Sequence, residues 1–241
     1  MRADKFLVQK GFFESRNRAV EAIKRGRVLI DKKIAKPSTK CNDSSDIEIL
    51  KDKFYISRSA QKLEFFLKEI DLDLKEKRAL DIGSSTGGFV QILLESGVGE
   101  VVAVDVGDNQ LHKSLRDNSR VRVFENCDIR EFKSDKPFDI VTCDVSFISI
   151  LKILKSIDRV SKRDIIILFK PQFEVGKGVK RNKRGVVLDS KAIDSAREKF
   201  EKATQDLGWR LQKSSKSKLA GKSGNIEYLY YFIKGVDGIK K

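Results

Sequence analysis

The chain has 241 residues, 40% of them hydrophobic and 35% charged, so it has enough apolar side chains for a folded core and enough length for two domains. Fifty Lys and Arg against 35 Asp and Glu give a net charge of +15, which favours a polyanion or an anionic surface as partner. The longest apolar runs, such as residues 165–169, are far shorter than the roughly 20 residues that span a bilayer, and the charged start at Asp4 and Lys5 is not typical of a secretory signal. We therefore expect a cytoplasmic protein without membrane insertion.

The cysteines and the single histidine limit the chemistry. Cys41, Cys127 and Cys143 are widely spaced and form no CxxC pair, which predicts isolated, reduced thiols. His112 is the only histidine, so a His-rich metal site is excluded and a Ser-His-Asp or Cys-His mechanism is disfavoured. We therefore expect no metal, and proton transfer has to use Lys, Asp, Glu or Tyr.

The first 40 residues carry twelve Lys and Arg against four Asp and Glu, a net charge of +8 that is over half of the total. Their pattern predicts helices at residues 3–10 and 16–25, with Gly11 ending the first, Ser15 as N-cap of the second and Gly26 just after it. A turn at residues 31–33 and strands at residues 28–30 and 47–49 follow. On charge alone, a basic helix face of this kind is either a binding surface or simply a solvated face.

The stretch ADKFLVQKGFFESRNRAVEAIKRGRVLIDKKIAKPSTK resembles the S4 RNA-binding module in its helix order, in the pattern SR…A…I..G.V.I.. and in its lysine-rich β turn. The resemblance implies a small N-terminal α+β domain over residues 1–53, in which residues 42–53 are a linker or the last strand. It also implies a basic face for structured RNA, made by Arg16, Arg18, Lys24, Arg25 and Arg27.

From residue 54 to residue 241 the pattern predicts an α/β domain. A helix beginning near Ser57 has an apolar stripe spaced i, i+3, i+4, i+7 from Leu63 to Ile70, with Lys62 beside it. Apolar strands are predicted at residues 79–82, 101–104, 121–124, 140–143 and 165–169, and helices at residues 89–95, 110–116, 148–160 and 190–207, ended by Gly208. Strands without alternation are typical of a buried parallel sheet, and a last pair of strands at residues 210–214 and 227–233 predicts an antiparallel edge.

A glycine-rich turn follows the first of these strands, in the sequence LDIGSSTGGFVQILL. Glycines in such a turn let the backbone approach a ligand, and Asp105, 24 residues after Asp81, can grip ribose hydroxyls. The glycine spacing departs from GxGxxG, which disfavours a dinucleotide, whereas an acid before the first glycine is the pattern of S-adenosylmethionine methyltransferases. The predicted cofactor-binding residues are Asp81, Gly83, Ser84, Ser85, Thr86, Gly87, Gly88, Asp105, Val106 and Asp128. Asp128 would lie near the adenine, or would only cap the turn after it.

Two further predicted strands end in a charged residue. Asp144 ends the strand in DIVTCDVSF, at the edge where open α/β sheets bind ligands. No Asp/Asn-Pro-Pro-aromatic loop is present there, which disfavours amino-group methylation, and Cys143 alternates away from the face of Asp144, so we assign it a structural role. Lys170 closes an apolar strand, where a lysine is unusual unless it has a partner or a task.

The motifs SRSAQKL, DIGSSTGGF, AVDVG, DVSFISI, KPQFEVGKG and GNIEYL together resemble the FtsJ-like ribose 2′-O-methyltransferases and, more closely, the TlyA group of rRNA methyltransferases, also called hemolysin-A-like. The resemblance implies a Rossmann-like methyltransferase sheet, S-adenosyl-L-methionine as cofactor, and ribosomal RNA or ribosomal subunits as partner. It implies cytidine in large-subunit rRNA as the target and, for some members, small-subunit rRNA too. The family's catalytic tetrad carries over to Lys62, Asp144, Lys170 and Glu227.

The chemistry of ribose methylation gives each of these four residues a role. A ribose hydroxyl is a poor nucleophile, so a base has to remove its proton, and a lysine can do so where a second cation and partial burial lower its pKa. Lys170 is the expected base, Lys62 supplies the second charge, and the two carboxylates position the ammonium groups. Without its motif, Glu227 would be taken for a solvated carboxylate at the start of a strand.

For the residues around the predicted site we expect contact with RNA, and each group also has a structural alternative. The basic segments 177–184 and 213–222, which include Lys180, Arg181 and Arg184, are either rims that grip phosphates or mobile solvated loops. Phe147 and Phe173 either stack on a flipped base or belong to the core. Two rival functions also stay open, a non-catalytic RNA-binding or ribosome-assembly factor and a membrane-active hemolysin; the oligomeric state is left open.

Overall fold

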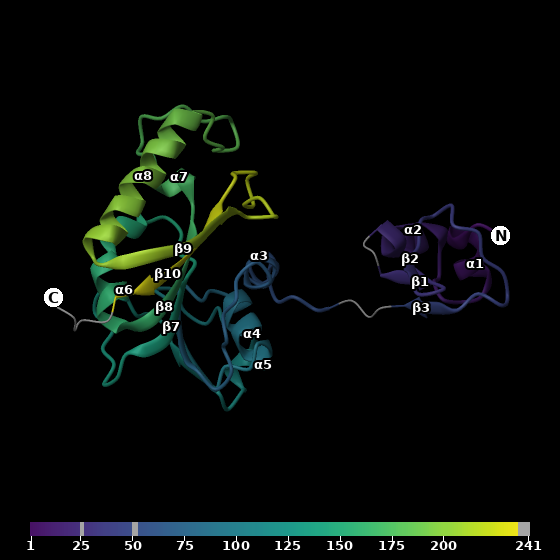
Figure 1. Cartoon of the computed structure of the whole chain (residues 1–241), viewed down its shortest axis with the longest axis horizontal. Helices are drawn as coiled ribbons and strands as arrows, with labels where there is room; N and C mark the ends of the chain where they lie inside the picture. Colours follow the sequence, from purple (N-terminus) through teal and green to yellow (C-terminus); the bar gives the residue numbers. More distant parts are fainter. Residues whose placement is uncertain (25–26, 50–52, 236–241) are drawn as a thin grey trace. The chain divides into compact units, whose positions relative to one another are not determined.

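The computed structural model describes residues 1–24, 27–49 and 53–235, and the chain divides into two compact units, Met1–Phe54 and Tyr55–Lys241 (Figure 1). The division falls one residue beyond the predicted boundary. Two predicted residues, Arg25 of the basic face and Gly26 after the second helix, lie outside the described residues.

The first unit is a small α+β domain. Its elements are α1 (Ala3–Gln9), α2 (Arg16–Lys24), β1 (Val28–Ile30), β2 (Lys33–Ile34) and β3 (Ile47–Ile49), and the antiparallel sheet has the order β2-β1-β3. Apolar residues of both helices and of β1, among them Leu7, Ala19 and Val28, are fully buried in one core. The predicted helices and strands are confirmed, whereas β2 was not predicted because both of its residues are exposed and show no alternation.

The second unit is built on a seven-stranded sheet of order β6-β5-β4-β7-β8-β10-β9. The strands are β4 (Arg78–Ile82), β5 (Glu100–Val104), β6 (Val121–Phe124), β7 (Phe138–Cys143), β8 (Ser161–Phe169), β9 (Trp209–Lys216) and β10 (Tyr228–Lys234). β4 to β8 pair in parallel, and β10 pairs antiparallel with both β8 and β9. The predicted fold class, a mostly parallel α/β sheet with an antiparallel last strand, is confirmed.

Helices cover both faces of this sheet (Figure 1). They are α3 (Arg58–Leu67), α4 (Gly88–Glu95), α5 (Lys113–Arg116), α6 (Leu154–Val160), α7 (Pro171–Glu174) and α8 (Ser190–Asp206), with a 3₁₀ turn at Ile150–Lys152. Phe66 of α3 and Phe89 of α4 belong to the core on one face, and Ile157 of α6 and Phe200 of α8 to the core on the other. Because apolar side chains fill both faces, residues 101–104 of β5 and 165–169 of β8 are apolar without alternation, whereas the edge strand β9 is largely exposed.

Several predicted helices are shorter in the structure. The helix predicted at residues 110–116 begins only at Lys113, because the His112 side chain caps it by accepting from the Ser114 backbone N–H. The helix predicted at residues 148–160 is split, because the Ser149 hydroxyl accepts from the Leu151 N–H and starts a 3₁₀ turn there. Ile70 was predicted on the stripe of α3, but it lies beyond the end of that helix and still packs on the core.

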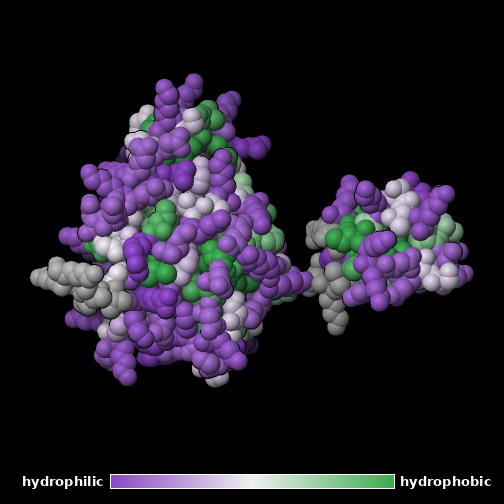
Figure 2. Space-filling model, in the orientation of Figure 1, coloured by the Kyte–Doolittle hydropathy of each residue, from purple (hydrophilic) through white to green (hydrophobic). Residues whose placement is uncertain are grey.

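Hydrophilic side chains cover most of the visible face in Figure 2, and apolar residues form scattered patches on it. Of the large apolar side chains, Phe147 is among the most exposed. Within residues 1–24, 27–49 and 53–235, no helix is both long enough and apolar enough to span a membrane.

Candidate active site

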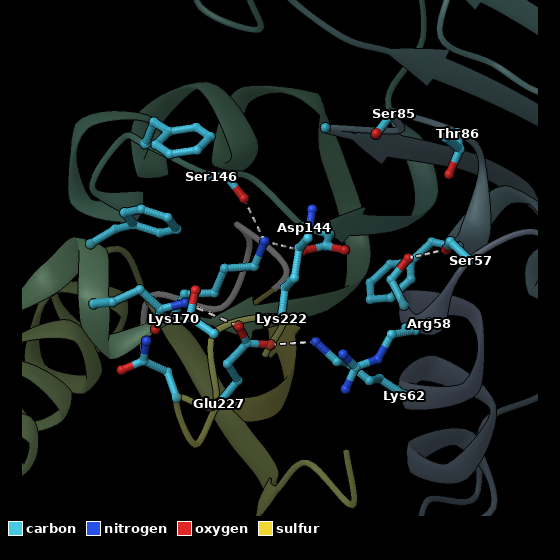
Figure 3. Close-up of a pocket in the computed structure, with 18 of the residues that line it drawn as sticks. Ser57, Arg58, Lys62, Ser85, Thr86, Asp144, Ser146, Lys170, Lys222 and Glu227 are labelled. Carbon is cyan, nitrogen blue, oxygen red and sulfur yellow. Dashed lines mark hydrogen bonds and ion pairs between the residues drawn. The ribbon is translucent and has the colours of Figure 1, made fainter. Parts of the chain in front are cut away.

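Next to four strands of the second unit, charged side chains lie together at one edge of the sheet. β4, β7 and β8 run in parallel, so the residues that follow them, including Asp144 and Lys170, emerge together. β10 runs the other way, and its first residue, Tyr228, pairs with Phe169 at the end of β8, so Glu227 arrives at the same edge. Lys62 reaches the edge from α3. The four residues of the predicted tetrad therefore line one cavity of about 860 Å³ (Figure 3).

The tetrad is arranged as two ion pairs. Lys170 Nζ lies 2.6 Å from Asp144 Oδ1 and donates a hydrogen bond to Ser146 Oγ at 2.8 Å. Lys62 Nζ donates to Glu227 Oε2 at 2.5 Å, and both of these side chains are buried. Burial raises the pKa of Asp144, although Lys170 beside it acts in the opposite direction. Each lysine therefore has a carboxylate partner, and both pairs face the same cavity.

Three residues that the sequence did not single out hold Glu227 and its loop. Gln172 Nε2 donates to Glu227 Oε1 at 3.0 Å. Gly221 lies so close to the same oxygen that an added Cβ would clash with it. Asn225 is buried, and its Oδ1 accepts from the Val187 N–H at 3.0 Å, which ties the loop before β10 to the loop before α8. Their positions depend on contacts between distant segments, which no local pattern predicts.

A second cavity, of about 400 Å³, lies beyond the ends of β4 and β5 and is lined by Asp105, Val106 and Asp128. The two cavities share lining residues, and among them are Gly83, Ser85 and Asp144. The cavities therefore meet beside Asp144, so an elongated ligand could occupy both.

Asp81 is the last residue but one of β4 and is 1% exposed. Thr142 Oγ1 donates to its Oδ1 at 2.6 Å, whereas its Oδ2 has no hydrogen-bond partner within the described part of the chain. Burial, with a smaller contribution from the nearby Asp144 and Asp105 carboxylates, raises the pKa of Asp81 to about 8. An unpaired carboxylate oxygen in the lining of the larger cavity is suited to a cationic ligand group.

We expect Asp81→Asn to stabilise the protein at pH 8. The folded-state pKa is about 8 and the unfolded value is about 4, so stability falls as pH rises between the two, by an amount on the order of several kcal/mol. Asparagine does not ionise and removes this loss. Urea unfolding of wild type and variant from pH 5 to 8 measures the effect, with the exposed Asp117→Asn as control. An identical pH dependence in wild type and Asp81→Asn would refute the explanation.

The glycine-rich turn serves two purposes. Gly83 has a φ of +77°, lines both cavities, and a Cβ there would lie 2.9 Å from the Asp144 carbonyl oxygen. Gly87 and Gly88 are not among the residues that line these two cavities, so their contact with a ligand stays a prediction. A Cβ on Gly87 would clash with Leu111 and Leu115, and one on Gly88 with the hydroxyls of Ser57 and Ser59, so these two glycines serve helix packing.

Ser84, Ser85 and Thr86 line the larger cavity, and the Ser85 N–H donates to Asp105 Oδ2 at 2.8 Å. The other Asp105 oxygen accepts from the Gly107 N–H at 2.7 Å, so backbone groups fix this carboxylate in the wall of the smaller cavity. Val106 is exposed in the same wall.

Asp128 caps the following turn, as one of its two predicted roles requires, and its place near the adenine stays a prediction. It lines the smaller cavity, and its Oδ1 accepts from the Arg130 N–H at 2.8 Å, which caps the following turn. A hydrogen bond from the Arg130 side chain lowers the pKa of Asp128. Cys143 is fully buried in the core, lines neither cavity, and has its pKa raised by burial, in agreement with the structural role predicted for it.

Ser57 precedes α3, but its side chain forms no cap. The hydroxyls of Ser57 and Ser59 lie 2.7 Å apart and both residues line the larger cavity. The sequence located this serine correctly at the helix start and did not predict that it faces a ligand cavity.

The basic residues divide into free and engaged ones. Arg184 and Lys222 line the larger cavity with exposed side chains, whereas Lys180 is exposed outside it. Arg181 also lines the larger cavity, and its guanidinium donates to the carbonyls of Val179, at 2.8 Å, and Gly176, at 2.7 Å, so it holds its own loop together; its contact with phosphate stays a prediction. The second basic segment is also not a loop throughout, because its residues 213–216 belong to β9.

In the first unit, Arg16 lies 2.7 Å from Asp4, which is 1% exposed, and the hydrogen bond from Arg2 is the largest effect lowering the pKa of Asp4 to about 2. Arg18 pairs with Glu14 at 3.0 Å. Arg16 therefore pairs with a buried carboxylate while it stays exposed, Arg18 and Lys24 are exposed too, and Arg27 is partly buried.

Phe147 follows β7 with a φ of +66° and is 92% exposed. Its ring centroid lies 5.2 Å from that of Phe173, and both rings line the larger cavity. The alternative that Phe147 belongs to the core is therefore wrong.

Comparison with known proteins agrees with this arrangement. The model of the FtsJ-like methyltransferases matches residues 55–234, and that of the S4 domain matches residues 1–47. The 23S rRNA (cytidine-2′-O)-methyltransferase TlyA of Campylobacter jejuni is 48% identical, over 97% of this chain and 100% of its own length. The 16S/23S rRNA (cytidine-2′-O)-methyltransferase TlyA of Mycobacterium tuberculosis is 38% identical, over 95% and 88%, and Hemolysin A of Brachyspira hyodysenteriae is 35% identical, over 97% and 100%.

Among solved structures, one from Streptococcus thermophilus that bears the name hemolysin has a TM-score of 0.71 at 32% identity, and covers 97% of this chain and 88% of its own. Magnesium protoporphyrin IX methyltransferase from Synechocystis, with bound S-adenosylmethionine, has a TM-score of 0.53 at 14% identity, over 74% and 79%. The second likeness concerns the fold alone.

Proposed function

The chain belongs to the FtsJ-like methyltransferases, in the TlyA group of rRNA methyltransferases, and from this premise we propose that it transfers the methyl group of S-adenosyl-L-methionine to the ribose 2′-hydroxyl of a cytidine in ribosomal RNA. The observation that carries the proposal is the convergence of Lys62, Asp144, Lys170 and Glu227 where two cavities meet. Large-subunit rRNA is the proposed substrate, and small-subunit rRNA is a second one, since the relatives' names include both.

The residues of the two cavities fit the cofactor part by part. The unpaired oxygen of Asp81 suits its α-ammonium group, and the hydroxyls of Ser57 and Ser59 suit its carboxylate. Asp105 suits the ribose hydroxyls, and Asp128 lies in the wall that would face the adenine. When bound, the cofactor supplies an activated methyl group on a sulfonium.

The tetrad then performs the proton transfer. Lys170 takes the proton of the ribose 2′-hydroxyl, while Asp144 fixes the position of its Nζ. Lys62, held by Glu227, places a second positive charge in the same cavity, where it orients the hydroxyl. Phe147 and Phe173 offer faces on which the flipped base stacks, and Arg184 and Lys222 lie at the rim for its phosphates.

The rival functions predict different sites. A non-catalytic RNA-binding factor has no need of two ion pairs at a ligand cavity, so the tetrad favours the enzyme. The hemolysin name belongs to a relative that aligns over the same length as the methyltransferases, so the name does not require a different site.

Mapping 2′-O-methylation in ribosomal RNA from cells with and without this protein tests the proposal. We expect one or more cytidine methylations to disappear without the protein and to return with the wild-type gene, but not with a Lys170→Ala gene. Identical methylation maps would overturn the proposed function.

We expect Asp105→Ala to weaken cofactor binding by about 1.5–3 kcal/mol, the scale of hydrogen bonds to a charged group. Calorimetric titration with S-adenosyl-L-methionine measures the loss, and Asp117→Ala, an exposed carboxylate at the end of α5, is the matched control. Wild-type affinity in Asp105→Ala would remove Asp105 from the cofactor site.

A further inference from the structure

Gln172 is held in one orientation by the tetrad. Its Nε2 donates to Glu227 Oε1 at 3.0 Å, while the other oxygen of that carboxylate accepts from Lys62 (Figure 3). A carboxylate paired with an ammonium group is ionised and only accepts hydrogen bonds, so the amide nitrogen of Gln172, and not its oxygen, has to face Glu227. The amide cannot flip without breaking this contact.

The fixed nitrogen leaves the amide oxygen of Gln172 as an acceptor in the cavity wall. This Oε1 is buried, and no group within residues 1–24, 27–49 and 53–235 donates to it. Gln172 lines the larger cavity and not the smaller one. Buried carbonyl oxygens are almost always hydrogen-bonded, and Gln172 lines the larger cavity, so we take a molecule bound there as the source of the donor.

The possible donors are few. Within the cofactor, the α-ammonium group has Asp81, and the adenosine part belongs to the smaller cavity, which Gln172 does not line. A cytidine inside an RNA chain has only two donors, its 2′-hydroxyl and its 4-amino group. The proton of the 2′-hydroxyl goes to Lys170, which leaves the amino group on the base.

We propose that Gln172 reads the base of the target nucleotide, by accepting a hydrogen bond from the 4-amino group of cytosine. Uracil carries a carbonyl oxygen at that position, so two acceptors would face each other. Phe173, the next residue of the one-turn helix α7, lies against Phe147. The same turn therefore supplies a ring that stacks on the face of the base and an amide that bonds to its edge. The inference rests on the proposed function and adds the determinant of its specificity.

Gln172→Met tests the assignment, because methionine has a similar length and neither donates to Glu227 nor accepts from a base. The substrates are large ribosomal subunits with the cytidine that wild type methylates, and subunits in which that cytidine is replaced by uridine. We expect wild type to prefer cytidine by about 10- to 100-fold in kcat/KM and Gln172→Met to prefer it by less than about threefold. Gln205→Met, on the exposed side of α8, is the matched control and keeps the wild-type preference.

The outcomes separate a specificity role from a merely structural one. If Gln172 only holds Glu227, the variant loses rate equally on both substrates and keeps its preference, which overturns the assignment. Equal methylation of cytidine and uridine by wild type overturns it too. If wild type methylates neither substrate, the proposed function itself fails. Gln172→Leu is the second variant, and cofactor affinity equal to wild type establishes that each variant is folded.

Discussion

Replacing Lys170 with alanine is expected to lower the rate of methyl transfer by about 10²- to 10⁴-fold, the range of a lost general base, and to leave the binding of cofactor and RNA intact. The reason is geometric, since Lys170 Nζ is the amine that Asp144 and Ser146 hold at the junction of the two cavities. Single-turnover assays measure the rate, and Lys191→Ala, an exposed lysine of α8, is the control.

Lys170→Arg separates proton removal from simple charge stabilisation. A guanidinium keeps its proton at any workable pH, so it cannot act as a base, although it supplies the same positive charge. We expect this variant to be as inactive as Lys170→Ala. Substantial activity in Lys170→Arg would assign proton removal to water or to Lys62.

Deleting residues 1–54 is expected to weaken RNA binding by about 10²-fold, and to make the slope of log affinity against log salt shallower by about one unit per lost phosphate contact. The deleted unit has its own core, and its first 40 residues carry a net charge of +8. Cofactor affinity should stay at the wild-type value, because both cavities lie in the second unit.

A full-length variant checks the same expectation without deletion. Lys24→Glu reverses an exposed charge at the end of α2, whereas Arg16 is avoided because it pairs with the buried Asp4. Filter binding across a salt series compares these proteins. Equal affinity and equal slope in wild type and truncated protein would show that the first unit has another task.

The sequence predicts those parts of the molecule that a local pattern specifies. Residues 165–169 are all apolar, because β8 is covered on both faces, and this run places Lys170 at the sheet edge. The glycine-rich turn marks the end of β4 in the same way. Lys62 and Glu227, in contrast, lie 165 positions apart in the chain. No local pattern predicts their contact, and in the sequence only the resemblance to a family places them in one site.

Close contacts made by the fold are not visible in the local sequence. The space beside Gly87 is taken by Leu111 and Leu115, and the space beside Gly88 by Ser57 and Ser59. Backbone carbonyls of its own loop accept from the Arg181 guanidinium. Gln172 was overlooked, since its importance follows from a carboxylate that arrives with the last strand.

The position of β10 between β8 and β9 also affects the nascent chain during synthesis. Until β10 pairs with β8, the backbone groups along Ile165–Phe169 form an open strand edge, and its side chains are among the most apolar of the chain. α8 and β9 are synthesised in between, so a nascent chain exposes this edge while they emerge from the ribosome. Substitutions that weaken the last hairpin should therefore appear first as aggregation of newly made protein, and only second as loss of activity.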